Sequence, residues 1–363
     1  MKIAIDLTSL SYHMTGIERY AACVSEQMLA QDSANEYYLL FRNNVYPIFT
    51  KYIDGERVKS VILSGENKLL FFQIILPRAL YRIDAEKYLF FAFTSPILFR
   101  KKGIINTIHD MGAWDFSESM KTLQKLYWQT TIKCSASVSE KIITVSNFSK
   151  GRISKILKFP NEKIHIVNSA IYDGVTKDYG VSFEKIKEKY KLPDKYILTL
   201  STLEPRKNMV LLLESFSRVK NDCDYDLVLV GRKGWKMDEV IDKYNKDGRI
   251  HITGFVDDEH ISVIYKNAMC FVFPSLYEGF GLPPIEALSL GTPVISSDAA
   301  SMPEILRKQA TFFKSNDMKA LEELLINLEE DLPNMPHELD EFQKRNYRFD
   351  ESAWKILKIL ERD

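Results

Sequence analysis

Short apolar runs alternate with longer stretches in which apolar residues recur every three to four positions. In the first half of the chain, the runs typical of buried strands are residues 3–7, 37–41, 58–63, 88–93, 103–109, 141–146 and 163–168. Helical spacing separates several of them, most clearly at 122–138 and 147–157. This alternation predicts a parallel sheet covered by helices on both faces.

A second series of the same kind follows a charged segment. Periodicity fades between Asp173 and Asp194, and we place a domain junction there. Strand-like runs then cover 196–201, 226–231, 250–254, 269–273 and 293–297, with helical patterns at 209–219, 237–244 and 259–267. We therefore expect an α/β protein with two doubly wound, Rossmann-like domains, residues 1–180 and 190–345.

The end of the chain, residues 346–363, predicts one more helix. Asp350 is a good N-cap residue, and an apolar face would be formed by Ala353, Trp354, Ile356, Leu357, Ile359 and Leu360. Such a face must pack against another part of the protein.

Composition narrows the functional classes. The 363 residues include 49 Lys plus Arg and 49 Asp plus Glu, so no overall positive field favours nucleic acid, and we expect no nucleic-acid partner. The four cysteines are far apart and show no metal-ligand spacing, so we expect reduced cysteines and no metal site. Asp6 interrupts the first apolar run, which argues against a signal peptide and for a cytoplasmic protein.

The most apolar stretch is Leu69 to Pro77. It is shorter than the roughly 18 to 20 residues that span a bilayer. A buried helix is the first interpretation. A peripheral membrane contact is the alternative, because Arg78 and Arg82 follow closely and could lie among lipid head groups.

The loop after the apolar run 268–273 carries the strongest chemical signal. Gly279 and Gly281 allow backbone N–H groups to approach a ligand, and the helix that follows directs its positive end into the same space, which suits phosphate. Glu278 and Glu286 flank this loop and would accept hydrogen bonds from hydroxyls. A pair of carboxylates could also indicate a hydrolase that works by acid and nucleophile.

Two other strand ends carry candidate residues. Arg206 and Lys207 follow the strand 196–201 immediately before a helix, a position that favours a bound anion such as a diphosphate, and Arg232 to Trp235 add positive charge after the next strand. His109 follows an apolar strand at the edge where open α/β sheets bind ligands, and could contact a substrate hydroxyl or accept a proton.

The first loop has one glycine, Gly16, at a helix start. A dinucleotide-binding fingerprint needs three glycines, so this loop does not favour a dehydrogenase. Gly16 could equally be only the beginning of the helix.

Taken together, these motifs resemble the retaining nucleotide-sugar glycosyltransferases of family 4, which have the GT-B fold. The resemblance rests on Glu278 and Glu286 as an E-x7-E motif, on Glu204 to Asn208, and on Gly291 to Ser296. The resemblance is strongest from about 196 to 306. Within the family, the sequence is similar to bacterial mannosyl- and hexosyltransferases of envelope polysaccharide synthesis. Thr202 stands where many members have an arginine, and Gly16 is single where many have two.

The resemblance implies a site in a cleft between an acceptor-binding first domain and a donor-binding second domain, with the last helix crossing back to the first. It implies catalytic roles for His109, beside the donor sugar, and Glu278. Donor contacts would come from Gly16, from Arg206 and Lys207 at the diphosphate, from the main chain of Val256 at the base, from Gly279, Phe280, Gly281 and Leu282, and from Glu286 at the ribose.

The predicted function is transfer of a hexose, with mannose as one candidate, from a GDP- or UDP-linked sugar to a saccharide or lipid-linked saccharide in polysaccharide or lipopolysaccharide synthesis. We expect no cofactor beyond this co-substrate and no metal, with retention by same-face substitution or by double displacement through Glu278. A GT-B phosphorylase, a nucleotide-sugar epimerase or a non-catalytic nucleotide-sugar-binding protein are the alternatives.

Overall fold

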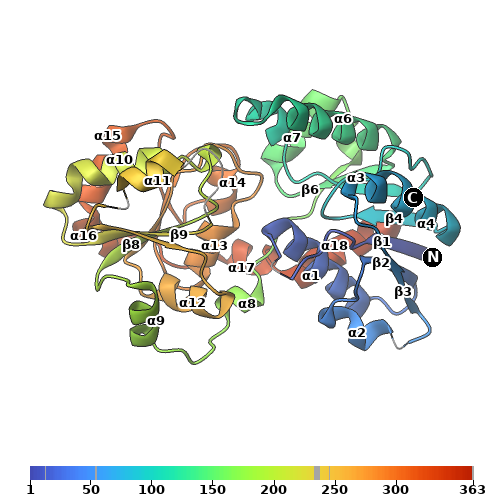
Figure 1. The fold of residues 1–363 in the computed structure, drawn as a ribbon, viewed down its shortest axis with the longest axis horizontal. Coiled ribbons are helices and arrows are strands. Elements are labelled where there is room, and N and C mark those ends of the chain that lie inside the picture. Colours follow the sequence, from blue (N-terminus) through green and yellow to red (C-terminus); the bar gives the residue numbers. More distant parts are fainter. Residues whose placement is uncertain (13, 54, 233–237, 245, 362–363) are drawn as a thin grey trace. The chain divides into compact units, whose positions relative to one another are not determined.

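The computed structural model describes residues 1–12, 14–53, 55–232, 238–244 and 246–361. The chain forms two compact units, Met1–Ala170 together with Arg345–Asp363, and Ile171–Lys344 (Figure 1). The boundary falls at Ala170, whereas the sequence places a junction between Asp173 and Asp194. The difference arises because the short helix α8 (Asp173–Thr176) packs against α12 (Asp258–Lys266) and α13 (Leu282–Ser289) of the second unit.

The first unit is built on a seven-stranded parallel sheet in the order β3-β2-β1-β4-β5-β6-β7. Its strands are β1 (Lys2–Asp6), β2 (Glu36–Arg42), β3 (Val58–Leu63), β4 (Lys87–Phe90), β5 (Ile104–Thr107), β6 (Lys141–Thr144) and β7 (Ile164–Ile166). Each matches a predicted run. The chain leaves β1 toward β2 and returns on the other side at β4, so the strand order reverses between β1 and β4.

Helices cover both faces of this sheet. They are α1 (Gly16–Gln31), α2 (Pro47–Ile53), α3 (Lys68–Leu70), α4 (Leu76–Ile83), α5 (Gly112–Asp115), α6 (Thr122–Val138), α7 (Asn147–Leu157) and α18 (Phe349–Glu361). Helices α6 and α7 have the predicted bounds, whereas α2 and α5 are too short to leave a periodic signal.

The last helix packs back on the first unit, as the sequence predicts. Helix α18 lies against α1, and its residues Ala353, Ile356 and Leu360 join the same core as Tyr20 and Val24.

Two details of the predicted tail helix are wrong. The helix begins at Phe349, so Asp350 lies inside the first turn, where it pairs with Arg348, and it is not the N-cap. Trp354 is 50% exposed because it lies away from the face that contacts α1.

The apolar stretch 69–77 is helical, but only one of its faces is buried. Helix α3 runs through a π-helical turn (η1, Phe71–Ile75) into α4. Phe71, Leu76 and Leu80 are fully buried, whereas Leu69 and Leu70 are 60% and 52% exposed. The buried-helix interpretation therefore holds for three of the nine residues, Phe71, Leu76 and Pro77.

The second unit has a six-stranded parallel sheet in the order β10-β9-β8-β11-β12-β13. Its strands are β8 (Tyr196–Leu200), β9 (Asp226–Val230), β10 (Ile250–Gly254), β11 (Cys270–Phe273), β12 (Val294–Ser297) and β13 (Thr311–Phe313). Strand β13 was not predicted, because three residues are too few to show a period. Here the order reverses between β8 and β11.

The helices of this part of the chain are α8, α9 (Phe183–Tyr190), α10 (Met209–Val219), α11 (Asp238–Tyr244), α12 (Asp258–Lys266), α13 (Leu282–Ser289), α14 (Met302–Leu306), α15 (Met318–Ile326), α16 (Leu328–Asp331) and α17 (Glu341–Asn346). Met237, the predicted start of α11, lies outside the described residues. Across the described ranges, the helices are all too short or too polar to cross a membrane.

Candidate functional site

Two loops meet at the point where the strand order of the second unit reverses. Strands β8 and β11 are neighbours, although about 70 residues separate them in sequence, so the loops after them leave the same edge of the sheet. The backbone N–H of Leu276 donates to the carbonyl of Arg206 at 2.9 Å. This topology brings the 204–208 stretch against the loop that contains Glu278.

Glu278 is the centre of a charged cluster. Its Oε1 accepts hydrogen bonds from Lys207 Nζ and Ser275 Oγ, both at 2.6 Å, and its Oε2 lies 3.2 Å from Arg206 Nη1. Burial alone would raise the pKa of this carboxyl, but the neighbouring charges of Lys207 and Arg206 and the hydrogen bonds from Lys207 and Ser275 outweigh it and hold the pKa below its ordinary value. Glu278 is therefore ionised, with both oxygens engaged.

The two cations of this cluster differ in what they can still bind. Arg206 contacts Glu204, Glu278 and the carbonyl of Tyr277 at once. The ammonium of Lys207 lies 5.5 Å from the Phe273 ring centroid and, among the described residues, donates a hydrogen bond to Glu278 alone. An ammonium has three donors, so Lys207 keeps donors that no described residue uses.

From the sequence, we expect a bound phosphate to balance the positive charges of Arg206 and Lys207. In the structure, the carboxylates of Glu204 and Glu278 supply this counter-charge. The structure thus places Arg206 and Lys207 beside Glu278. Arg206 serves chiefly to hold the loops together, and Lys207 is the better placed of the two to meet an anion.

The glycine loop leads directly into α13. Gly281 has φ +85°, a conformation in which any other residue is strained, and a Cβ there would also displace the end of the Met302 side chain. Phe280 is buried, and the hydroxyl of Ser301 donates to the Glu278 carbonyl at 2.9 Å. Leu282 begins the helix. The loop is thereby held with the amino end of α13 at the edge of the sheet.

Glu286 lies one turn into α13, in surroundings unlike those of Glu278. It is 8% exposed and accepts a hydrogen bond from the Tyr265 hydroxyl at 3.2 Å. The hydroxyl of Tyr265 thus holds Glu286, whereas Lys207, Arg206 and Ser275 hold Glu278.

Val256 follows β10, two strands from β8, and is buried. Beside it, Phe255 is 47% exposed, with the guanidinium of Arg232 4.5 Å from its ring centroid. Lys233 to Trp235, also predicted to add charge here, lie outside the described residues.

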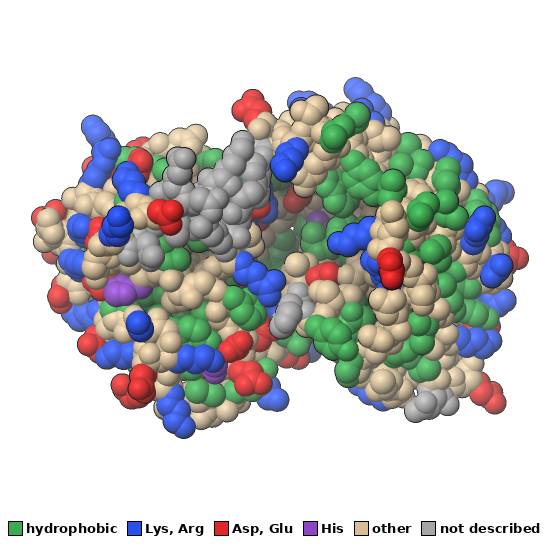
Figure 2. All heavy atoms as spheres, in the orientation of Figure 1, with side chains coloured by type: hydrophobic (Ala, Val, Ile, Leu, Met, Phe, Trp, Pro, Cys, Tyr) green, Lys and Arg blue, Asp and Glu red, His purple; other side chains and the backbone are tan. Residues whose placement is uncertain are grey.

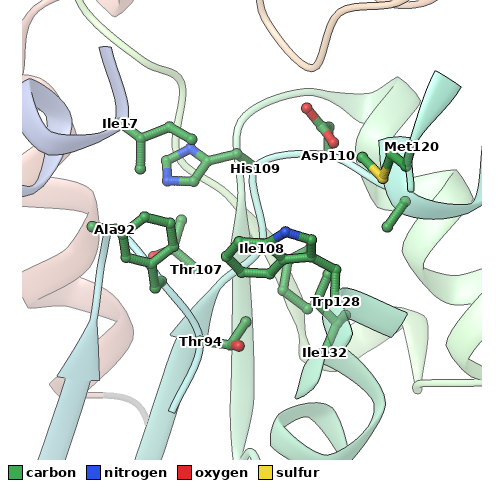
Figure 3. Close-up of a pocket in the computed structure, with 12 residues that line it drawn as sticks. Ile17, Ala92, Thr94, Thr107, Ile108, His109, Asp110, Met120, Trp128 and Ile132 are labelled. Atoms are coloured by element: carbon green, nitrogen blue, oxygen red, sulfur yellow. The ribbon is translucent and has the colours of Figure 1, made fainter. Parts of the chain in front are cut away.

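In the first unit, His109 follows β5 and faces a pocket (Figure 3). Its Nε2 lies 2.8 Å from the carbonyl of Phe91, which can only accept, so the proton resides on Nε2. Burial lowers the pKa of the imidazole. The ring is therefore neutral at pH 7, and Nδ1 is a hydrogen-bond acceptor.

Gly16 is the first residue of α1, as the simpler interpretation of the first loop predicts. The Glu18 carboxylate accepts a hydrogen bond from the backbone N–H of Thr15 at 2.7 Å, which caps the helix. The next residue, Ile17, lines the same pocket as His109. The fold therefore brings the first loop and His109 together.

Several residues at these places were not found from the sequence. They are Ser275, Ser301 and Tyr265, which hold the glutamates, and Thr94, Thr107 and Trp128, which line the pocket. A serine three residues before Glu278 is a weak local signal for the first. The others depend on contacts between distant segments and leave no pattern in the sequence.

No cluster of three or more metal-ligating side chains occurs within the described part of the chain. Cys270 is a buried thiol, and Cys23 is buried as well.

Comparisons with known proteins agree with this architecture. The family model for glycosyl transferases group 1 matches residues 182–346. An O-antigen chain mannosyltransferase B from Escherichia coli is 27% identical, over 91% of each chain. The O-antigen chain mannosyltransferase RfbU of Salmonella typhimurium is 31% identical, over 67% of this chain and 65% of that protein.

Similarity in fold extends further than similarity in sequence. The crystal structure of Anabaena Alr3699/HepE, in complex with UDP and glucose, superposes with a TM-score of 0.74 over 99% of both chains at 12% identity. Both sheets, the family match over 182–346 and the Escherichia coli relative that spans 91% of the chain agree: the chain belongs to the retaining group 1 glycosyltransferases of GT-B fold.

Proposed function

We propose that the protein transfers a hexose from a nucleoside diphosphate sugar to a saccharide or lipid-linked saccharide in the synthesis of an O-antigen-type polysaccharide. The main supporting observation is the Lys207–Glu278 cluster at the carboxyl ends of β8 and β11, beside the amino end of α13. Mannose is the proposed sugar, because two relatives bear the name mannosyltransferase. The nucleoside diphosphate of the proposed donor is GDP or UDP.

The donor would bind mainly to the second unit. We assign the diphosphate to Lys207, steadied by Arg206, and to the backbone from Gly279 to Leu282. Glu286 would accept hydrogen bonds from the ribose hydroxyls, and the main chain of Val256 would meet the base.

From the first unit, His109 would receive a sugar hydroxyl at Nδ1, and the backbone at Gly16 would approach the phosphates. The neutral imidazole suits this role because it accepts a hydrogen bond without adding charge beside the reacting carbon.

For the chemistry we favour substitution on one face of the sugar. The bond from the anomeric carbon to the phosphate oxygen breaks, the acceptor oxygen attaches to the same face, and the acceptor proton passes to the departing phosphate. Glu278 is a poor nucleophile because Lys207, Arg206 and Ser275 occupy its oxygens. Isolation of a covalent glycosyl adduct on Glu278 would instead establish double displacement.

We propose that no metal is required, because Lys207 and the helix dipole of α13 can stabilise charge on the departing diphosphate. Chelator should leave the initial rate unchanged. A loss of rate that Mg²⁺ or Mn²⁺ restores would disprove this part of the proposal.

The function is tested first by a thermal-shift panel of UDP, GDP, ADP and dTDP and their sugars, since a ligand that binds the native state raises the midpoint. A transfer assay with the stabilising donor and neutral mannosides then follows product formation. Sugar consumption that needs free phosphate would indicate a phosphorylase, and a changed sugar without any acceptor would indicate an epimerase. Binding with no turnover under any of these conditions would indicate a nucleotide-sugar-binding protein.

A membrane surface is a further proposed partner, with the protein peripheral at the inner face of the cell membrane. Apolar side chains gather on the surface over α3, α4 and α6 (Figure 2). Leu69 and Leu70 are exposed on α3, and Arg78, Tyr81 and Arg82 are exposed on α4. Apolar side chains flanked by cations suit an anionic bilayer.

Co-sedimentation tests this contact. Vesicles that contain phosphatidylglycerol should bind the protein at least fivefold better than phosphatidylcholine vesicles. The double substitution Leu69→Ser, Leu70→Ser should abolish that preference. Ile326→Ser, at a 45% exposed position in the other unit, is the matched control and should have no effect.

A further inference from the structure

A pocket of about 260 Å³ opens within the first unit, beside His109. Its walls come from the start of α1, from β5, from the segments that follow β4 and β5, and from helix α6, and every lining residue belongs to one compact unit. Figure 3 shows Thr94, Thr107, Trp128, His109 and Asp110 around the same space. Pockets for drug-sized ligands span about 300–1,000 Å³, so this one suits a single small ring.

Two buried hydroxyls in this pocket have no protein partner. Thr94 and Thr107 are 8% and 2% exposed, and neither Oγ1 has a hydrogen-bond partner among the described residues. The neighbouring Asn106 shows the contrast, because its amide bonds to Ser95 and Ser139. Buried polar groups normally have a hydrogen-bond partner. Two unsatisfied hydroxyls in one pocket therefore indicate that a ligand supplies the partner.

The charge of the pocket decides what kind of ligand fits. Among the lining residues that the structure describes there is no lysine or arginine. Asp110 Oδ1 accepts a hydrogen bond from the backbone N–H of Gly112 at 2.8 Å, and Oδ2 accepts none from the described residues. A carboxylate beside a neutral imidazole repels phosphate and uronate, but it accepts hydrogen bonds from hydroxyls.

One wall is aromatic. The indole of Trp128 stacks on Phe93, with ring centroids 5.7 Å apart and planes 26° apart. Trp128 itself lines the pocket, together with Ile108 and Ile132. Flat apolar walls with a few placed polar groups match a pyranose, which has an apolar C–H face and hydroxyls at its edge.

We propose that this pocket is the acceptor subsite and binds the terminal, uncharged pyranose of the acceptor. The C–H face of the sugar packs on Trp128, and its hydroxyls pair with Thr94, Thr107 and Asp110. The assignment as acceptor rests on the proposed function. The selection against charged sugars rests on the pocket alone.

Binding is measured directly on the whole protein, by intrinsic tryptophan fluorescence and by saturation-transfer NMR. The probes are methyl α-mannopyranoside, methyl α-glucopyranoside and methyl α-galactopyranoside, against methyl glucuronide and mannose 6-phosphate. At least one neutral probe should bind, and the charged probes should bind at least tenfold more weakly. The fluorescence change should disappear in Trp128→Phe.

Threonine-to-valine variants separate a ligand contact from a structural one. Thr94→Val and Thr107→Val should each raise the Kd of the neutral probe at least fivefold, while Tm stays the same or rises, because valine removes an unpaired buried hydroxyl. Thr131→Val is the control. That residue is also buried, but its hydroxyl donates to the Tyr127 carbonyl at 2.8 Å and does not line the pocket.

Three outcomes would overturn the proposal: no neutral pyranoside binds, charged sugars bind equally well, or the two variants bind as the wild type does. Preferential binding of n-octanol would likewise assign the pocket to an aliphatic chain. A parallel titration with nucleoside diphosphates keeps the two claims apart. Nucleotide binding without pyranoside binding defeats the subsite alone, whereas the reverse result defeats the proposed function.

Discussion

At the residue scale, the cluster around Glu278 combines a stability role with the proposed chemistry. The carboxylate is 7% exposed, and its charge is tolerated because Lys207 and Arg206 lie beside it. Removing one partner of a buried ion pair leaves the charge of the other partner buried without a counter-charge. Lys207 is therefore expected to affect both the fold and the rate.

We predict that Lys207→Ala lowers kcat about 100-fold, about 3 kcal/mol, the size of one lost electrostatic donor. It should also lower the free energy of unfolding by roughly 3 kcal/mol, because Glu278 keeps its charge with one cation fewer. Steady-state kinetics and urea denaturation measure the two effects.

The double variant Lys207→Ala, Glu278→Gln separates these contributions. Neutralising the carboxyl should recover most of the stability but none of the rate. Lys195→Ala, which removes an exposed lysine, should change neither. A normal rate in Lys207→Ala would place the diphosphate elsewhere.

Asp6 gives a pH-dependent prediction. It is 4% exposed at the end of β1, and burial raises its pKa from 3.8 to about 6, although Thr8 donates to it through both N–H and hydroxyl. The folded state thus prefers the protonated form. The associated stability is fully present below pH 3.8 and is lost as the pH rises through about 6, in total roughly 3 kcal/mol.

Asp6→Asn cannot ionise and should therefore be more stable than wild type at pH 7.5, with a much smaller difference at pH 4. Denaturation curves of both proteins at the two pH values measure this. An equal difference at both values would show that the carboxyl does not titrate on unfolding.

His109 has the opposite effect on stability. Its pKa in the folded protein lies below the ordinary 6.5 because of burial. The stability linked to the neutral ring is present above pH 6.5 and is lost as the pH falls through the folded pKa. The acceptor Nδ1 that the proposed function uses is therefore kept at neutral pH.

At the scale of elements, α18 is the clearest case in which packing overrides a pattern. Its apolar residues outnumber those that α1 can cover, so Ile356 is fully buried while Trp354 remains 50% exposed. The helical period of the sequence alone predicts that Ile356 and Trp354 lie on the same apolar face of the helix.

We predict that Ile356→Ala destabilises the first unit by about 3 kcal/mol, since it removes methyl groups from a packed core. Trp354→Ala, which deletes a larger but exposed side chain, should cost less than about 0.5 kcal/mol. Thermal unfolding of both variants tests this ranking. A larger loss for Trp354→Ala would mean that the exposed indole contacts something else.

At the scale of the whole molecule, the two units differ in how the chain completes them. The second unit is one continuous segment, and its core is drawn from residues 197–335. The first unit needs both ends of the chain, because Ala353, Ile356 and Leu360 fill the core beside α1.

Residues 171–344 should therefore fold when expressed alone and bind the nucleoside diphosphate that stabilises the whole protein. Residues 1–170 alone should remain poorly folded until a peptide of residues 345–363 is added. Circular dichroism and thermal shift with nucleotide follow both. Cooperative folding of 1–170 without the peptide would show that α18 is dispensable.

The sequence by itself determined the alternation of strands and helices, because burial on both faces of a parallel sheet and the helical period are local properties. The ranges of α6, α7, α10, β3 and β10 agree with the prediction residue by residue. It also placed Arg206, Lys207, Glu278 and His109 at strand ends. The short elements near the end of the second unit, such as β13, left no such signal.

Only the tertiary structure decided what these residues contact. Because β8 lies beside β11, Lys207 pairs with Glu278, and the charge expected for a phosphate is already partly met by carboxylates. In the same way, β4 and β5 meet α6, so Thr94, Thr107 and Trp128 face one pocket. Such contacts follow from strand order and side-chain packing between distant segments, which no local pattern in the sequence encodes.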